Sequence, residues 1–332
     1  MNILKRIALT LVLLVAAAPL VGLLYQTIMT QVDDSNYPAP GAFVEANGAR
    51  LHVVCEGEGM PVVLMETGLG GDATWTWKRI AHKLSANNKI CYYDRAGYGW
   101  SSTSNTVRSV QSLAVDLAAV ADYVAPNSKL VLAGHSFGGP IIRAYTKKHA
   151  ERVAGLVFVD SAHEEQGARL SAAAGVTETD WTRLAYEYGA PVGWVRLPRS
   201  RDLPKADTID QDDYERLIAH TSQNKFVRSY LAESDTWIVD RVAPEFDYDF
   251  GDTPLFVISQ DTNLNVPDEE KADYAVWAEL QQELVELSRD SEFRMPEGAP
   301  HGIPYEMPEE VINAVNNVLR KSKMKAATEG AG

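Results

Sequence analysis

Hydrophobic residues along the chain fall into two kinds of segment, short apolar runs and longer amphipathic stretches. Short apolar runs between turn signals are typical of buried strands, and apolar residues repeated at helical spacing are typical of helices. The predicted strands are residues 42–46, 50–56, 61–66, 89–93, 129–133, 153–159, 253–259 and 292–295. The predicted helices are residues 74–84, 107–124, 137–150, 268–288 and 308–320. This alternation predicts an α/β fold with a mostly parallel sheet of eight strands and helices on both faces.

The alternation of predicted strands and helices is interrupted in residues 164–246. No strand is predicted there, and the helical stretches are rich in aromatic residues. We interpret the interval as an inserted helical lid between the two parts of a catalytic core, residues 41–163 and 247–320. Residues 321–332 are expected to form a disordered tail.

The chain begins with a segment unlike the rest. Lys5 and Arg6 precede residues 7–24, an apolar run without a charge, and residues 25–29 extend it. A helix of this length spans roughly the 30 Å hydrocarbon core of a bilayer. We therefore expect residues 1–30 to be a membrane anchor.

Residues 31–40 form a polar linker in this interpretation. Positive charge before the apolar run, with Asp33 and Asp34 after it, predicts a cytoplasmic N-terminus and a catalytic domain outside the cytoplasm. A secreted protein with a cleaved signal is the alternative, because residues 16–18 are three alanines. We favour the retained anchor because Pro19 follows that site and the apolar run continues.

Length, charge and cysteine content exclude some classes of function. A chain of 332 residues can bury one large core, and a net charge of −14 makes nucleic acid an improbable partner. Cys55 and Cys91 are the two cysteines, so the chain has no four-cysteine zinc site. We expect two buried thiols rather than a disulfide.

Residues 130–134 form an apolar strand that ends in the motif GHSFGG at residues 134–139, directly before a helix. A serine hydroxyl is a weak nucleophile, and a sharp strand-to-helix turn exposes it beside a base. Gly134 and Gly138 allow such a turn. Ser136 is therefore the predicted nucleophile, although a glycine-rich turn that merely packs tightly remains the structural alternative.

The same turn predicts part of an oxyanion hole. The backbone N–H of Phe137 lies at the start of the helix and should point toward the reacting carbonyl. A second donor should come from the glycine-rich loop at residues 67–71, and we assign the N–H of Leu69. An ordinary flexible turn is the plainer interpretation of that loop.

His301 is the predicted base. Where a serine nucleophile stands at such a strand-to-helix turn, the acid and then the histidine follow it along the chain. His301 lies between the last predicted strand and the last helix, which agrees with this order. The acid has two candidates. Asp160 ends the strand 153–159, and Asp261 follows the strand 253–259. We prefer Asp160. At the site after the strand 253–259, Asn263 occupies the position where we would most expect the aspartate.

The motifs DRAGYGWS at residues 94–101, GHSFGG at 134–139 and VDSAHE at 159–164 resemble the α/β-hydrolase superfamily over residues 41–320. The resemblance is greatest to bacterial lipase- and esterase-like members with an N-terminal anchor. It implies the α/β-hydrolase fold with a Ser-His-acid triad that cleaves small esters or related acyl compounds.

Two features depart from that pattern. Thr67-Gly68 replaces the usual histidine-glycine of the oxyanion loop, and Asn263 weakens the more common acid site.

The predicted activity is that of a serine hydrolase of carboxylic esters, acting on a small-molecule substrate without metal or cofactor. A serine at the turn argues against haloalkane dehalogenase or epoxide hydrolase chemistry, which uses an aspartate nucleophile. Carbon–carbon bond hydrolysis, lactone opening and aminopeptidase action stay open. A non-catalytic ligand-binding or scaffold protein on the same fold is the alternative from another class.

Overall fold

The computed structural model describes residues 3–170, 180–197, 210–239, 245–263, 266–268 and 270–329. Parts of the predicted lid and the last three residues of the predicted tail lie outside these ranges. The chain divides into two compact units, Met1–Ala39 with Glu178–Leu231, and Pro40–Thr177 with Ala232–Gly332.

The larger unit contains one sheet of eight strands in the order β1-β2-β4-β3-β5-β6-β7-β8. β1 and β2 pair antiparallel, as do β2 and β4, and every later pair is parallel. The strands are β1 (Ala42–Ala46), β2 (Ala49–Glu56), β3 (Val62–Glu66), β4 (Ile90–Tyr93), β5 (Leu130–His135), β6 (Val153–Val159), β7 (Leu255–Ile258) and β8 (Ser291–Arg294). The predicted mostly parallel sheet is confirmed.

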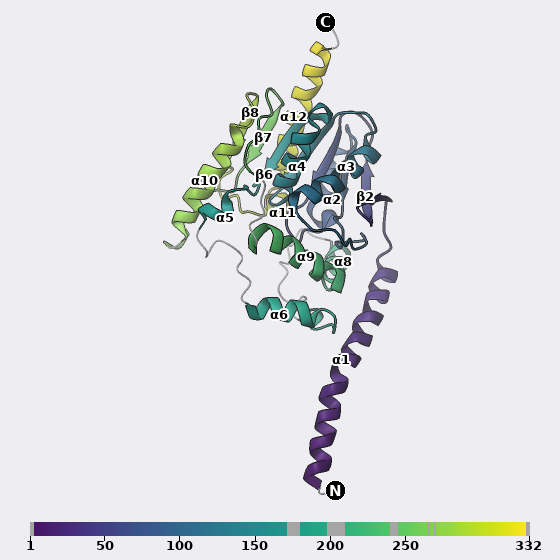
Figure 1. The fold of residues 1–332 in the computed structure, drawn as a ribbon. Coiled ribbons are helices and arrows are strands. Elements are labelled where there is room, and N and C mark those ends of the chain that lie inside the picture. The colour runs from purple at the N-terminus through teal and green to yellow at the C-terminus, as the bar shows by residue number, and fades with distance from the viewer. Residues whose placement is uncertain are drawn as a thin grey trace. The chain divides into compact units, whose positions relative to one another are not determined.

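Helices of this unit pack on both faces of the sheet, as Figure 1 shows. They are α2 (Ala73–Leu84), α3 (Val110–Val124), α4 (Gly138–Lys148), α5 (Gln166–Arg169), α10 (Lys271–Val285), α11 (Ile303–Glu306) and α12 (Pro308–Glu329), with short helical turns at Ala150–Arg152 and Asp235–Val239. Helix α9 (Asn224–Ser234) contributes its last residues to the unit.

Alternating side chains of the central strands supply two separate cores. In β3, Val62 and Leu64 join the cluster that contains α3 and α4 residues, while Val63 and Met65 join the cluster that contains α2 and α12 residues. Successive residues of a strand point to opposite faces, so a strand buried on both faces reads as a continuous apolar run. This explains why the central strands can be recognised in the sequence.

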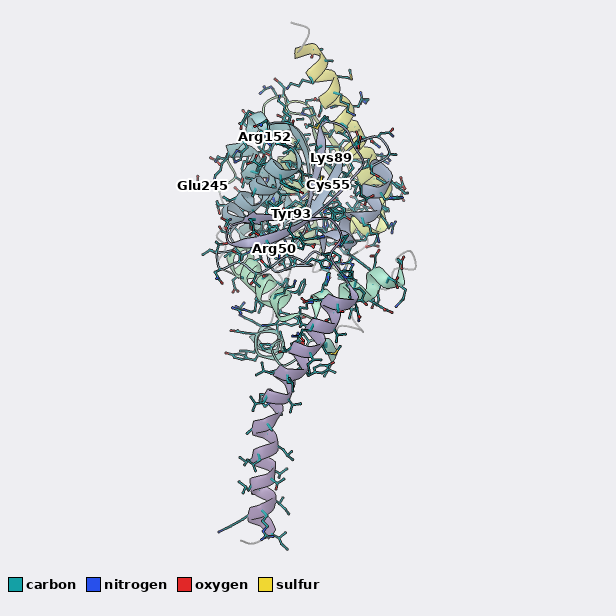
Figure 2. The ribbon with its side chains drawn as sticks, turned by 90° about the vertical axis from the view of Figure 1, so that its right-hand side faces the viewer. Arg50, Cys55, Lys89, Tyr93, Arg152 and Glu245 are labelled. Carbon is teal, nitrogen blue, oxygen red and sulfur yellow. A yellow bond between two sulfur atoms is a disulfide. The ribbon has the colours of Figure 1, made fainter. Side chains whose placement is uncertain are left out.

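Cys55 and Cys91 form a disulfide, so the expectation of two buried thiols is wrong. The two residues lie directly opposite each other in the antiparallel pair of β2 and β4, with Cα atoms 4.1 Å apart. Figure 2 labels Cys55 in β2 and Tyr93 in β4. The sequence could not reveal the bridge, because it depends on the register between two strands that are distant in the chain.

The predicted disorder from residue 321 onward is also wrong for residues 321–329, which continue α12. Lys321 pairs with Asp290 at 2.5 Å and with Glu292 at 2.9 Å. The Ser322 hydroxyl donates to the carbonyl of Ala154 at 2.7 Å. These contacts with the larger unit hold a segment whose composition alone suggested a tail.

The smaller unit combines the N-terminal helix with helices of the predicted lid. Its helices are α1 (Ile3–Asn36), α6 (Asp180–Gly189), α8 (Gln211–Thr221) and the first part of α9. The predicted linker is therefore wrong for residues 31–36, which are helical. Asp33 pairs with Arg196 at 2.9 Å, and Asp34 accepts a hydrogen bond from Gln223 at 3.0 Å.

The division differs from the predicted lid boundaries as well. Residues 164–170 and 245–246, predicted to belong to the lid, lie in the larger unit, as do Glu233 and Trp237. Glu233 is buried in a charge network of that unit, and the Trp237 ring packs 5.1 Å from that of Phe137.

Candidate active site

Ser136 occupies a tight turn between β5 and α4. Its backbone φ of 50° lies in the left-handed region, which residues other than glycine rarely adopt. The surrounding backbone fixes this conformation. The N–H of Ser136 donates to Val159 at 3.1 Å, and its carbonyl accepts from Gly139 at 3.0 Å and Ala162 at 2.9 Å. The turn therefore holds the serine in a strained, defined position.

Close backbone approaches explain the two glycines that flank the serine. A Cβ atom on Gly134 would lie 2.8 Å from the carbonyl carbon of Gly138. One on Gly138 would lie 2.6 Å from the carbonyl oxygen of Glu66. Both distances are shorter than a carbon atom tolerates, so the turn requires glycine at both positions.

His301 lies between β8 and α11 with its imidazole half-exposed. Its Nε2 is 3.1 Å from the Ser136 Oγ. The backbone carbonyl of His301 accepts a hydrogen bond of 3.0 Å from the Nε2 of His135, which is buried. The sequence interpretation left His135 without a role, and the structure gives it contact with the loop that carries His301.

Asp160 completes a continuous line of polar atoms with these two residues. Its Oδ2 is 2.5 Å from the Nδ1 of His301. Its Oδ1 accepts hydrogen bonds of 2.9 Å from the backbone N–H of Gln260 and from the indole of Trp277. The residue is fully buried, with a backbone φ of 39°. Three donors, including the imidazole, thus surround this carboxylate.

Asp261, the alternative acid, lies apart from this line. Its Oδ1 accepts from the N–H of Asn263 at 2.9 Å and its Oδ2 from that of Gly298 at 2.8 Å. These backbone hydrogen bonds lower the pKa of the Asp261 carboxyl. The carboxylate orders the loop before His301 but does not contact the imidazole in the part of the chain that the structure describes.

The two histidines at the site have opposite pKa shifts. Partial burial disfavours the charged form of the half-exposed His301, but the hydrogen bond and the negative charge of Asp160 outweigh it and raise the pKa. Burial, with a smaller contribution from the charge of His301, lowers the pKa of His135 to about 3. His135 is therefore neutral near pH 7, while His301 can gain and release a proton.

The glycine-rich loop after β3 lies against the nucleophile. A Cβ atom on Gly68 would stand 3.2 Å from the Ser136 Cβ and 3.6 Å from its Oγ. Leu69, the predicted oxyanion residue, is half-buried and packs against the core. Phe137 begins α4. The loop that carries Leu69 therefore lies close to Ser136, the residue directly before Phe137.

Arg95 holds that loop through the carbonyl groups of its backbone. Its buried guanidinium donates to the carbonyls of Thr67 and Gly68, both at 2.8 Å. It also pairs with Glu66 at 2.7 Å and Glu233 at 2.8 Å. A guanidinium can serve several acceptors in one plane, which suits it to hold two carbonyls and two carboxylates together.

Further charged and phenolic groups surround this pair of carboxylates. Arg108 bridges Glu233 at 3.2 Å and Asp116 at 2.9 Å, and the Tyr98 hydroxyl donates to Glu233 at 2.8 Å. Despite burial, the positive charges of Arg95 and Arg108 lower the pKa of Glu233. Burial raises the pKa of Glu66, and Arg95 offsets this only in part.

Sequence reasoning missed Trp277, Arg95 and Glu233 as contributors to the site. Arg95 lies within the DRAGYGWS motif, and nothing in the spacing of the sequence relates it to residue 233. The DRAGYGWS motif was the one available signal. Among the described residues, no group of three or more His, Cys, Asp or Glu side chains could hold a metal ion.

Three solved structures share this architecture. A serine hydrolase involved in carbazole degradation has a TM-score of 0.61 and 21% identity, covering 85% of this chain and 98% of that one. A thermophilic esterase from Thermogutta terrifontis has a TM-score of 0.60 and 21% identity, covering 86% and 99%. A putative epoxide hydrolase from Pseudomonas aeruginosa has a TM-score of 0.63 and 19% identity, covering 86% and 97%. At such identities the likeness concerns the fold.

Curated relatives match shorter parts of the sequence. The putative carbamate hydrolase RutD of Azorhizobium caulinodans is 32% identical over 118 residues, which are 36% of this chain and 43% of that protein. The 2-hydroxymuconate semialdehyde hydrolase of Pseudomonas sp. (strain CF600) is 28% identical over 128 residues, 38% of this chain and 45% of that protein. The matches thus span less than half the length of these relatives.

The family comparison covers far more of the chain. A model of the alpha/beta hydrolase family matches residues 62–314, which include the strands β3 to β8 and the turn at Ser136. The sheet order and the likeness to solved hydrolases agree with this match. The chain belongs to the alpha/beta hydrolase family.

Proposed function

We propose that the protein is a serine hydrolase that cleaves carboxylic esters or related acyl compounds. The observation that carries the proposal is the line of polar contacts from Ser136 Oγ through the His301 ring to Asp160, with distances of 3.1 Å and 2.5 Å. Such an arrangement of nucleophile, base and acid is the general device for activating a serine hydroxyl.

In the first half of the proposed reaction, the Ser136 Oγ attacks the carbonyl carbon of the substrate. The hydroxyl proton passes to the Nε2 of His301, and Asp160 stabilises the resulting imidazolium. The backbone N–H groups of Phe137 and Leu69 are the proposed donors to the tetrahedral oxyanion. Loss of one such donor typically reduces turnover about 10² to 10³-fold.

The intermediate then collapses to an acyl-enzyme. His301 returns its proton to the leaving alcohol, which departs. A water molecule next gives a proton to the Nε2 of His301 and attacks the acyl carbon. The acid is then released while the Nε2 of His301 returns its proton to the Ser136 Oγ. The same imidazole thus takes up and gives back the proton in both halves of the reaction.

Serine at the turn also separates this chain from one group of its structural neighbours. Epoxide hydrolases appear among them, and such enzymes form an alkyl ester through a carboxylate nucleophile. Ser136 favours an acyl substrate instead.

A panel of nitrophenyl esters of increasing acyl length tests the proposed activity. We expect hydrolysis by the full-length protein and a loss of at least about 10⁴-fold in the Ser136→Ala variant, the scale that removal of a triad member usually produces. Ser161→Ala is a folded-state control, because Ser161 is buried and donates to a neighbouring backbone carbonyl. Equal rates in wild type and Ser136→Ala would contradict the proposal.

We further propose that α1 anchors the protein in a membrane. The segment Lys5–Asn36 is long and apolar enough to cross a bilayer, and its most apolar stretch has no residue buried within the structure. The positive charge at Lys5 and Arg6 supports a cytoplasmic N-terminus. The disulfide between Cys55 and Cys91 supports a catalytic unit in an oxidising compartment outside the cytoplasm.

A further inference from the structure

The smaller unit joins α1 to lid residues through buried polar contacts. Gln26 donates to the carbonyl of Ser222 at 2.9 Å and accepts from Arg196 at 2.6 Å. Arg196 also pairs with Asp33 at 2.9 Å. Gln26 and Asp33 are almost fully buried. Because buried polar groups need their partners, these contacts hold the end of α1 and the segment that follows α6 together.

The contacts also show where along α1 the lid segment lies. A Cβ atom on Gly22 would be 2.7 Å from the carbonyl oxygen of Val192. One on Gly193 would be 2.8 Å from the Tyr25 ring. From Arg6 to Gln26 a helix rises about 30 Å, the thickness of the hydrocarbon core. Val192 and Gly193 therefore lie against α1 near the C-terminal end of its apolar run.

Four large apolar side chains close to this contact are exposed. Leu184 and Tyr188 lie one helical turn apart on α6, with 40% and 68% of their surface exposed. Trp194 and Leu197 follow the contact, with 60% and 69% exposed. Trp and Tyr are enriched at the boundary between lipid and water, because their rings are apolar and their N–H and O–H groups are polar.

We propose that Leu184, Tyr188, Trp194 and Leu197 form a membrane-interface surface that enters the headgroup region of the bilayer crossed by α1. Its occupant is lipid, because the surface belongs to the same unit as the apolar helix and lies at the outer end of the apolar run. The inference rests on the proposed membrane anchor. It adds a second contact with the bilayer, made by the lid segment itself.

Site-directed spin labelling of the full chain in phosphatidylcholine vesicles tests this surface. Both native cysteines form the disulfide, so a single introduced cysteine can be labelled selectively. Separate Tyr188→Cys and Trp194→Cys variants report on the proposed surface. Val15→Cys reports on the anchor, and Val115→Cys, exposed on α3, reports on water.

The measurement is the relaxation of each label by oxygen, which concentrates in lipid, relative to a nickel chelate, which stays in water. We expect labels at positions 188 and 194 to shift toward the lipid value found at position 15. Lipid values at position 15 with water values at both 188 and 194 would overturn the interface surface and leave the anchor intact. Water values at position 15 would overturn the anchor, and the surface with it.

Discussion

Asp160 controls both the orientation and the charge of His301. The carboxylate is buried, contacts the Nδ1 of the imidazole and raises the pKa of His301. Only the neutral imidazole can accept the serine proton, so activity should rise with pH as His301 loses its proton. The acid limb of the pH profile should therefore lie above the ordinary histidine value of about 6.5.

Replacing Asp160 by asparagine should lower the pKa of His301 and move the acid limb to lower pH. Turnover should also fall by roughly 10⁴-fold, because the amide favours the wrong imidazole tautomer. The pH dependence of kcat/KM for a nitrophenyl ester measures both effects. Asp261→Asn is the matched control, which should leave the position of the acid limb unchanged. Full turnover in Asp160→Asn with its loss in Asp261→Asn would reverse the assignment.

Gly68 lies directly against the nucleophile. A methyl group there would stand 3.2 Å from the Ser136 Cβ, 3.3 Å from the His135 Nδ1 and 3.6 Å from the Ser136 Oγ, so it would crowd the serine hydroxyl. Gly68→Ala should reduce kcat/KM strongly while the thermal midpoint changes little. Gly48→Ala is a control for the loss of a glycine, although its positive φ adds local strain. Unchanged turnover in Gly68→Ala would show that the substrate does not approach this loop.

The glycine-rich loop depends on an element that lies behind it. Arg95 follows β4 and holds the carbonyls of Thr67 and Gly68, so it acts as a positioning residue. Arg95→Lys keeps the positive charge but loses the planar set of donors. We expect a lower kcat with little change in KM, because the loop would hold its N–H groups less well in the transition state.

Arg152→Lys is the matched control for that substitution. Arg152 also donates to two backbone carbonyls, those of Ser128 and Ala125, and it is labelled in Figure 2. Its hydrogen-bond partners among the described residues are Ser128, Asp122 and Ala125, which lie outside the candidate site. If both variants lose kcat equally, Arg95 contributes only to general stability. If neither does, the loop does not depend on Arg95.

The disulfide provides a prediction about the pairing of strands. It closes a loop between positions 36 residues apart and joins β2 to β4. Replacing both cysteines by alanine should reduce the free energy of unfolding by about 2 to 4 kcal/mol. Urea titration of wild type and the double variant, each without reductant, measures the difference. Identical midpoints would contradict a stabilising bridge.

Strands were easier to predict than helix ends or distant contacts. The apolar runs of β3, β5 and β6 are buried on both faces, so their pattern needs no tertiary information. Helix α3 begins at Val110 rather than at residue 107, because the Ser109 hydroxyl caps it through the N–H of Ser112. Helix α12 continues to Glu329 because Lys321 and Ser322 find partners on the sheet.

The same distinction applies to the candidate site. Ser136 and His301 could be proposed from a local motif and from the order of residues along the chain. Asp160 follows β6 and His301 follows β8, and β7 lies between these two strands in the sheet, so their proximity depends on the order of the strands. Trp277 and Glu233 come from helices whose positions no local pattern reveals, so neither could be chosen before the structure was known.

The proposed anchor gives the whole molecule one expected topology. The N-terminus should lie in the cytoplasm and the larger unit outside it. Protease added to intact cells or spheroplasts should digest the larger unit while a cytoplasmic marker protein survives. Resistance of this unit until the membrane is permeabilised would contradict the topology, although it would leave the proposed chemistry untouched.

Labelling with a fluorophosphonate probe tests the proposed activation of Ser136 by His301, because the probe reacts with a serine only where a neighbouring base activates it. We expect rapid labelling of the full-length protein on the peptide that contains Ser136. We expect no labelling of Ser136→Ala and much slower labelling of His301→Ala. A folded wild-type protein that does not react, or one that reacts equally fast without His301, would contradict the proposed activation.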